Sequence, residues 1–322
     1  MDFDEISQKL NSKVSEKILT IKGGNSSVVK AKLKDDSLIA VKIYKGKATR
    51  IQRMLDRELN AISFLTSNGL LNVPEILETR RDLGLIVYRW IDGDSPDSNT
   101  KCMEAILAMC MELDKLSKDC YFESAVDAAF YVQDINLQIL DRITELRIEY
   151  KFQIAKTICA LLDDKLKNYQ SIFTRNQKLL PCTLNISDLG THNMLLSGDS
   201  FKFVDFEFFG FDSVDKMVGD FLLHPRNQFQ KNEIFAFKEN ISNNLAWGPE
   251  SLKCTLPILS LKWASIAFKR EFKTLAQDYS DDNVQKFLNE SNGMKYLDYY
   301  DILISIDSID SISSFNLFTA TI

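Results

Sequence analysis

Two aspartates and an asparagine lie close together in the second half of the sequence, at a spacing that suits metal-assisted phosphate chemistry. They are Asp188 and Asn193 in the segment DLGTHN, and Asp205 in the segment FVDFE. Mg²⁺ takes one or two protein oxygens along with water and phosphate oxygens, so Asn193 and Asp205 suffice to hold it. Asp188 is then free to orient an acceptor hydroxyl and to receive its proton. The pattern D-x₄-N-x₁₁-D therefore predicts transfer of a phosphoryl group to a hydroxyl.

A lysine in an apolar strand supplies the cation that such a reaction needs. Lys42 ends the segment IAVK, and a lysine that faces inward there requires an anionic partner. Glu58 lies sixteen residues later within a helical pattern, where it can pair with Lys42 and hold it toward a phosphate. Either residue alone is more often a solvated surface charge. The pair at this spacing favours phosphate binding.

A glycine-rich turn, GGNSS, precedes this lysine. Glycine lets backbone N–H groups approach phosphate oxygens closely, and serine hydroxyls add further donors. Gly24, Ser26 and Ser27 are therefore candidate nucleotide-binding residues. The same residues would also make an ordinary hairpin turn, and that alternative stays open.

These motifs together resemble the aminoglycoside phosphotransferase and choline kinase group of the protein-kinase-like fold, including bacterial phosphotransferase-like proteins. The resemblance rests on DLGTHN and VDFE, with AVK and RE upstream. It implies an α+β, bilobal fold, with a small β-rich N-terminal lobe that holds one main helix and a larger, mostly helical C-terminal lobe. It also implies an ATP- and Mg²⁺-dependent phosphotransferase with Asp188 as catalytic base and Asn193 and Asp205 as Mg²⁺ ligands.

The resemblance assigns further residues to the nucleotide. Lys42 would bind the α- and β-phosphates and be held in place by Glu58. The adenine would meet backbone groups of the connection from Arg89 to Ile91. Asp220 matches an aspartate that braces the catalytic loop through backbone N–H groups.

Three positions depart from the pattern of this group. Ile186 stands where a histidine usually precedes the catalytic aspartate by two residues, which puts the rate in doubt more than the fold. Gly190 and the Phe-Glu after Asp205 make a protein substrate less expected. Glu207 either reaches a second metal ion or faces solvent. These departures leave an alternative, a catalytically weak kinase-like module that binds nucleotide, that is, a pseudokinase.

Hydrophobic periodicity predicts elements in the order that this fold requires. The sequence predicts two domains, a nucleotide-binding lobe over 1–91 and a catalytic and acceptor-binding lobe over 92–322. The elements expected are a helix over 1–15, strands at 17–21, 28–33 and 38–44, a helix over 48–68, strands at 74–79 and 85–91, a linker at 92–99, helices over 100–178, a β-rich insert at 182–209 with a hairpin, and a helix over 251–272.

Composition narrows the class of protein. The 322 residues are 45% hydrophobic and 26% charged, which is ordinary for a globular chain, and the net charge of −6 disfavours a nucleic-acid binder. No apolar run approaches the roughly 18 residues that span a membrane, and no leader segment is recognised. The six cysteines show no metal-like spacing and are expected to be free thiols. A cytoplasmic location is expected, and the oligomeric state is not predicted.

Charge is divided unevenly along the chain. Residues 1–91 carry 16 basic and 11 acidic side chains, whereas the remainder carries 23 basic and 34 acidic ones. The basic excess in residues 1–91 suits a polyphosphate donor, and the acidic excess in residues 92–322 suits Mg²⁺ and a cationic acceptor. The expected acceptor is a hydroxyl on a small polar molecule such as an amino sugar, an amino alcohol or a sugar. Aromatic residues that could line its pocket are Tyr121, Phe122, Phe130, Tyr131 and Trp263.

Overall fold

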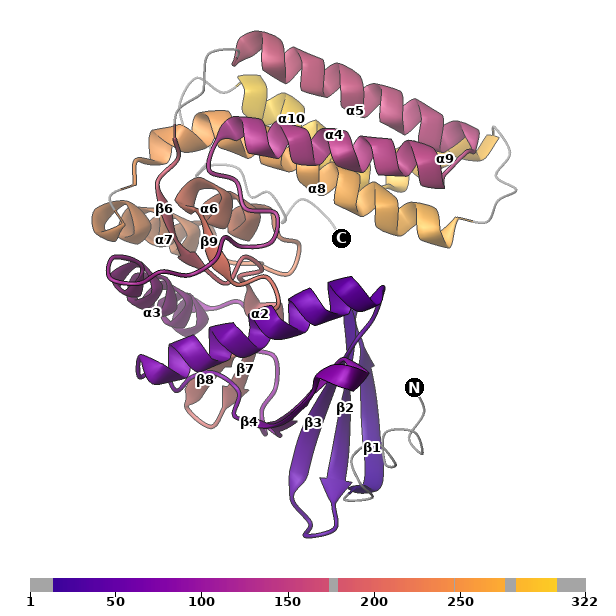
Figure 1. Cartoon of the computed structure of the whole chain (residues 1–322). Helices are drawn as coiled ribbons and strands as arrows, with labels where there is room; N and C mark the ends of the chain where they lie inside the picture. The colour runs from indigo at the N-terminus through magenta and orange to yellow at the C-terminus, as the bar shows by residue number, and fades with distance from the viewer. Residues whose placement is uncertain (1–13, 174–178, 246, 276–281, 306–322) are drawn as a thin grey trace. The chain divides into compact units, whose positions relative to one another are not determined.

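The computed structural model describes residues 14–173, 179–245, 247–275 and 282–305 (Figure 1). They divide into two compact units. Unit 1 joins the chain up to Asp97 with Thr191–Phe209, and unit 2 joins Ser98–Gly190 with the chain from Gly210 onward. Unit 1 thus takes in a segment that the sequence assigns to the second lobe. Most of the helix expected over 1–15 lies outside the described residues.

Unit 1 is built on a five-stranded antiparallel sheet in the order β1-β2-β3-β5-β4. One face of the sheet carries small and β-branched residues such as Val29, Ala31, Ile39, Val41 and Val87, which form its core. Because side chains alternate along a strand, the neighbours of these residues on β3 project from the opposite face. The strands are β1 (Val14–Lys22), β2 (Ser26–Leu33), β3 (Leu38–Tyr44), β4 (Ile76–Arg80) and β5 (Leu85–Arg89).

One long helix, α2 (Ala48–Ser67), belongs to the same unit, and its bounds match the expected ones closely. It buries an apolar stripe together with two charged residues, Arg57 and Glu58. Asn68 caps the C-terminal end of the helix, and Gly69 then takes a positive φ of 84°, which suits glycine after a helix end.

A short hairpin completes unit 1. Its strands are β7 (Met194–Ser197) and β8 (Ser200–Phe203), and they lie within the β-rich insert that the sequence predicts at 182–209. The N–H of Phe203 donates to the carbonyl of Asn72 (2.8 Å), which fixes the hairpin to the segment that follows α2. A bridge between Asp94 and Leu196 ties it to the expected linker.

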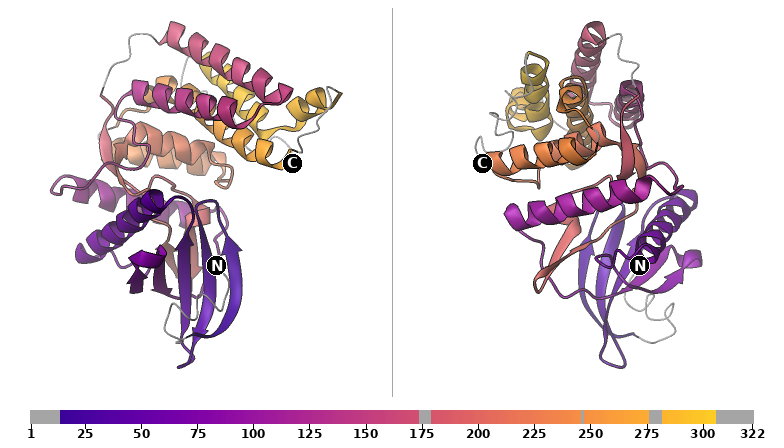
Figure 2. Two further views of the ribbon diagram at one scale, coloured as in Figure 1. Left: turned by 45° about the vertical axis from the view of Figure 1, so that its right-hand side comes forward. Right: turned by 90° about the vertical axis from the view of Figure 1, so that its left-hand side faces the viewer.

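Unit 2 is mostly helical. Helix α8 contacts α4, α5, α6 and α10, and Figures 1 and 2 show α4, α5, α8 and α10 side by side. The helices are α3 (Thr100–Ser117), α4 (Val132–Glu149), α5 (Gln153–Ile172), α6 (Val214–Leu223), α7 (Lys231–Asn244), α8 (Leu252–Thr274), α9 (Asp282–Glu290) and α10 (Asn292–Ser305). A two-stranded antiparallel sheet of β6 (Cys182–Asn185) and β9 (Gly210–Ser213) lies in the same unit.

The α+β class expected from the sequence is confirmed, with an antiparallel sheet first and a mostly helical part after it. All six cysteines are free thiols, and Cys102, Cys110 and Cys159 are buried. Within the described ranges, no helix has the length and the apolar character needed to cross a bilayer.

Candidate nucleotide and metal site

Lys42 is the centre of a cluster of carboxylates in unit 1. It lies on β3 opposite Val28 of β2 and Ile86 of β5, and only 4% of its surface is exposed. Its Nζ lies 2.5 Å from Glu58 Oε2, 2.5 Å from Asp205 Oδ1 and 3.2 Å from Glu207 Oε2. The predicted pairing of Lys42 with Glu58 is therefore present in the structure, and Asp205 joins it.

The electrostatics of this cluster favour a charged lysine. Burial alone lowers the pKa of Lys42, but the carboxylates of Glu58 and Asp205 hold that pKa well above its usual range. Burial also raises the pKa of Glu207 to about 7, although the charge on Lys42 acts against this rise. Glu207 is 2% exposed, so the expectation that it could face solvent is wrong.

The hairpin β7–β8 places the two expected metal ligands at its open end. Met194 pairs with Phe203, and the N–H of Val204 donates to the carbonyl of Asn193 (2.9 Å). Asp205 is the next residue along, with a positive φ of 69° and a side chain that is 35% exposed. A part-exposed carboxylate beside an amide-bearing residue is a donor set of the kind that Mg²⁺ prefers.

The glycine-rich turn between β1 and β2 is tied to this cluster. Asn25 donates through Nδ2 to Glu207 Oε1 (2.9 Å) and accepts at Oδ1 from Arg50 Nη2 (3.0 Å). Ser26 is buried and Ser27 is half-buried at the start of β2. Gly24 is exposed, and an added Cβ there would meet no atom within 4 Å. The turn therefore lies close to the carboxylates while Gly24 stays open.

The expected adenine contacts lie at the end of β5. Arg89 is exposed, and its guanidinium pairs with Glu75 (2.6 Å). The N–H of Arg89 donates to the carbonyl of Glu75, and the N–H of Trp90 donates to the carbonyl of Leu38 (3.1 Å). Ile91, the next residue, is half-buried and lies outside the strand.

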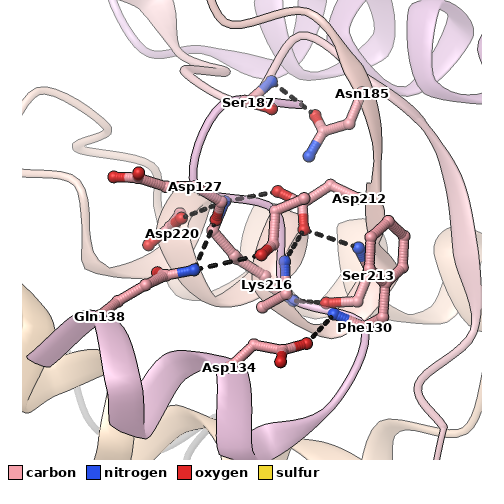
Figure 3. Close-up of polar contacts among 12 residues, drawn as sticks. Asp127, Phe130, Asp134, Gln138, Asn185, Ser187, Asp212, Ser213, Lys216 and Asp220 are labelled. Carbon is pink, nitrogen blue, oxygen red and sulfur yellow. Dashed lines mark hydrogen bonds and ion pairs between the residues drawn. The ribbon is translucent and has the colours of Figure 1, made fainter. Parts of the chain in front are cut away.

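Asp188 lies in unit 2, in the loop after β6, and is half-buried. The Asn185 side chain accepts from the N–H of Ser187 (2.9 Å), and Ser187 takes a positive φ of 67° (Figure 3). On the other side of Asp188, Asn227 donates to the carbonyl of Leu189 (3.3 Å). Two asparagines thus hold the backbone before and after the expected catalytic base.

A chain of buried charges lies next to this loop in unit 2. Figure 3 shows Lys216 between Asp212 and Asp220, with Nζ–O distances of 2.5 and 3.4 Å. Asp220 also accepts from Lys262 Nζ (3.1 Å) and Trp263 Nε1 (2.9 Å). These contacts join Asp220 to side chains of helices α6 and α8. Its expected role of bracing the catalytic loop through backbone N–H groups stays a prediction.

Several residues of the cluster were not predicted from the sequence. Tyr44 and Tyr88 both donate to Glu58, and Arg57 donates to the carbonyl of Phe209 (2.8 Å). Tyr44 could have been found, because it lies two residues after Lys42 on one strand and so shares its face. Tyr88 requires the register of β5 against β3, which the sequence does not give.

Comparison with solved structures identifies the architecture. Choline kinase LicA from Streptococcus pneumoniae superposes with a TM-score of 0.60 at 15% identity, over 92% of this chain and 99% of that one. A choline/ethanolamine kinase family protein from Mesorhizobium loti gives 0.61 at 15%, over 98% and 99%. Spectinomycin phosphotransferase in complex with ADP and spectinomycin gives 0.59 at 12%, over 98% of each chain.

The fold is that of the choline kinase and aminoglycoside phosphotransferase group. No protein-family model matches the sequence, and no curated protein sequence matches it either. The segments DLGTHN and VDFE imply a protein-kinase-like fold, and the structure confirms that fold. Roles for individual residues stay predictions.

Proposed function

We propose that the protein is an ATP- and Mg²⁺-dependent phosphotransferase that phosphorylates a hydroxyl of a small polar molecule. The observation that carries the proposal is the buried Lys42 ammonium, 2.5 Å from both Glu58 and Asp205. Burying a lysine among carboxylates costs desolvation free energy, so such a cluster is weak evidence for stability and favours a functional role for the charge. Phosphate binding next to a metal ligand is such a role.

Asn193 and Asp205 would hold Mg²⁺ in this proposal. The metal, when bound, neutralises charge on the phosphates and polarises them toward attack. Lys42 binds phosphate oxygens, and Glu58 holds Lys42. Asp188 orients the acceptor hydroxyl and takes its proton.

Nucleotide binding falls to the remaining predicted residues. The backbone at Gly24 and the hydroxyls of Ser26 and Ser27 would bind phosphate oxygens, and the backbone from Arg89 to Ile91 would meet the adenine. The solved structure of spectinomycin phosphotransferase contains ADP, which supports a nucleotide as the donor.

The neighbours support an acceptor class, and so does the excess of acidic over basic side chains in residues 92–322. The neighbours are named for choline, ethanolamine and spectinomycin, which supports a small polar acceptor such as an amino alcohol, an amino sugar or a sugar. Among the candidate aromatics, Trp263 stacks with Tyr296 at 6.0 Å and is half-buried. Tyr121 is 96% exposed, so it has little protein around it to form a pocket wall. The cytoplasmic location stays a prediction.

The test is release of ADP from ATP in the presence of a panel of amino alcohols, amino sugars, sugars and aminoglycosides. We expect turnover with at least one class, and a loss of at least about 100-fold for Asp188→Ala and for Asp205→Ala, because Asp188 would take the proton of the acceptor and Asp205 would hold the metal ion. Circular dichroism and the melting temperature check that both variants fold. Full activity in a clean Asp205→Ala preparation would overturn the metal assignment.

The alternative is a kinase-like module that binds nucleotide and turns over slowly or not at all. The observation that favours it is Ile186, which is 1% exposed and contributes to the core at the position where the resemblance implies a histidine. A thermal shift with Mg·ATP, but no ADP release with any acceptor of the panel, would support this alternative.

A further inference from the structure

The carboxylate of Glu58 accepts hydrogen bonds from two tyrosines in addition to the one from Lys42. Tyr88 Oη donates to Glu58 Oε1 (2.7 Å), and Tyr44 Oη donates to Glu58 Oε2, the same oxygen that Lys42 binds. Both oxygens of the carboxylate are therefore engaged. A carboxylate with donors on both oxygens has one orientation available to it.

The sheet explains how two strands supply these hydroxyls. Tyr44 lies two residues after Lys42 on β3, so both side chains project from the same face. Tyr88 lies on β5 directly opposite Ala40, which precedes Lys42 by two residues and shares that face as well. Glu58, on helix α2, thus meets three donors from adjacent strands.

Both tyrosine hydroxyls stay protonated and can therefore donate hydrogen bonds. Tyr44 is 4% exposed and Tyr88 is 6% exposed. Burial and then the charge of Glu58 raise the pKa of each hydroxyl well above its usual range. Each hydroxyl therefore keeps its proton at neutral pH and can donate a hydrogen bond to Glu58.

Lys42 has one carboxylate for each of its three N–H donors. Its Nζ lies 2.5 Å from Asp205 and 3.2 Å from Glu207 as well as 2.5 Å from Glu58. The position of the ammonium therefore depends on where these carboxylates are held. Glu58 is the one of the three that two tyrosine hydroxyls bind. The adjacent Arg57, which donates to the carbonyl of Phe209 (2.8 Å), fixes the same turn of α2 from its other side.

We propose that Tyr44 and Tyr88 are positioning residues that fix the Glu58 carboxylate, so that Lys42 is already in place when the phosphates arrive. The inference rests on the proposed function, because it assigns Lys42 to phosphate. Preorganising a binding group lowers the cost of ordering it at the moment of binding. Loss of the two hydroxyls therefore weakens binding of the phosphates and leaves binding of the nucleoside unchanged.

The experiment compares the wild-type protein with the double variant Tyr44→Phe/Tyr88→Phe. Calorimetry measures Kd for Mg·ATP, and competition measures Kd for adenosine, which lacks phosphates. We expect Kd for Mg·ATP to rise by about tenfold, because two hydrogen bonds to a charged group are lost. Kd for adenosine stays within about twofold. A purely structural role would weaken both.

The matched control is Tyr169→Phe. Tyr169 is 1% exposed in unit 2, and its hydroxyl donates to the carbonyl of Cys254 (2.8 Å). This variant loses one buried hydroxyl hydrogen bond far along the chain from Glu58, so it lowers the melting temperature and leaves Kd for Mg·ATP unchanged. If the double variant does not fold, each single Tyr→Phe variant is expected to raise Kd by about threefold.

The outcomes separate the inference from the function. If the wild-type protein binds Mg·ATP and the tyrosine variants bind it equally well, the inference alone is overturned. It is also overturned if Kd for adenosine rises in parallel. If the wild-type protein binds no Mg·ATP, the proposed function falls, and the role of the tyrosines falls with it.

Discussion

A buried carboxylate on α6 shows how a single residue can make stability depend on pH. Asp215 is 0% exposed, and its Oδ1 accepts from Thr255 Oγ1 at 3.4 Å, a long hydrogen bond. Its Oδ2 has no hydrogen-bond partner among the described residues. Burial raises the pKa of Asp215 above its ordinary value of 3.8. The folded protein therefore binds this proton more tightly than the unfolded chain does.

The sign of the pH effect follows. A carboxyl with a raised pKa in the folded state favours folding most at low pH, and that contribution is lost as the pH rises from about 4 through the folded pKa. Asp215→Asn has no proton to lose. We expect its free energy of unfolding, relative to the wild type, to rise between pH 4 and pH 7 by about 1 kcal/mol.

Urea denaturation at pH 4, 5.5 and 7 measures this difference. Asp164→Asn, at an exposed position of α5, is the control for the change of side chain itself. A difference between Asp215→Asn and wild type that stays constant across the three pH values would contradict the prediction.

The sequence predicted which residues carry the chemistry better than it predicted how deeply they are buried and what they contact. Lys42 pairs with Glu58 as expected, because a charged residue in an apolar strand needs a partner. The contact of Asp205 with Lys42 was not predicted. Burial of Glu207 could not be predicted, since it depends on Asn25 and Lys42, which lie far away in the chain.

At the scale of elements, β9 depends on one glycine. Gly210 begins the strand with φ 157°, and the segment before α4 runs closely beside it. The N–H of Ala125 donates to the carbonyl of Phe211 (2.9 Å), and the N–H of Phe211 donates to the carbonyl of Glu123 (3.0 Å). A Cβ on Gly210 would lie 2.5 Å from Ala125 N and 2.6 Å from Glu123 O.

Gly210→Ala is therefore expected to destabilise the protein by about 3 kcal/mol, because backbone atoms would have to move apart. Gly69→Ala is the comparison, since Gly69 also has a positive φ but an added Cβ there meets no atom within 4 Å. That variant should lose only about 1 kcal/mol, from backbone strain alone. Chemical denaturation compares the two, and equal losses would show that the close approach is not what matters.

Elements with a clear period were predicted well, and short buried ones were not. The bounds of β3 at 38–44 and of α2 at 48–67 agree with expectation, because alternation and helical periodicity are both visible there. The pairing of β6 with β9 was missed. Each has four residues, too few to show a period, and 24 residues lie between them.

At the scale of the whole molecule, a ligand that binds only the folded state stabilises it. Mg·ATP at about 100 times its Kd should add about 2.7 kcal/mol and raise the melting temperature by roughly 5 °C. Because Asn193 and Asp205 would hold the metal, EDTA should remove most of this shift. Differential scanning fluorimetry measures both conditions. An equal shift by ATP in EDTA would contradict the metal assignment.

Unit 1 is made of two segments that lie far apart in the sequence, and this affects how the chain folds during synthesis. The strands and α2 are made first, but Phe203, Phe206 and the partner of Lys42 at Asp205 come only after the whole of Ser98–Gly190. Until residues 205–207 have been made, Lys42 lacks two of its three carboxylates. We expect such long-range completion to slow the folding of unit 1 and to leave the nascent chain prone to aggregate until this unit is complete.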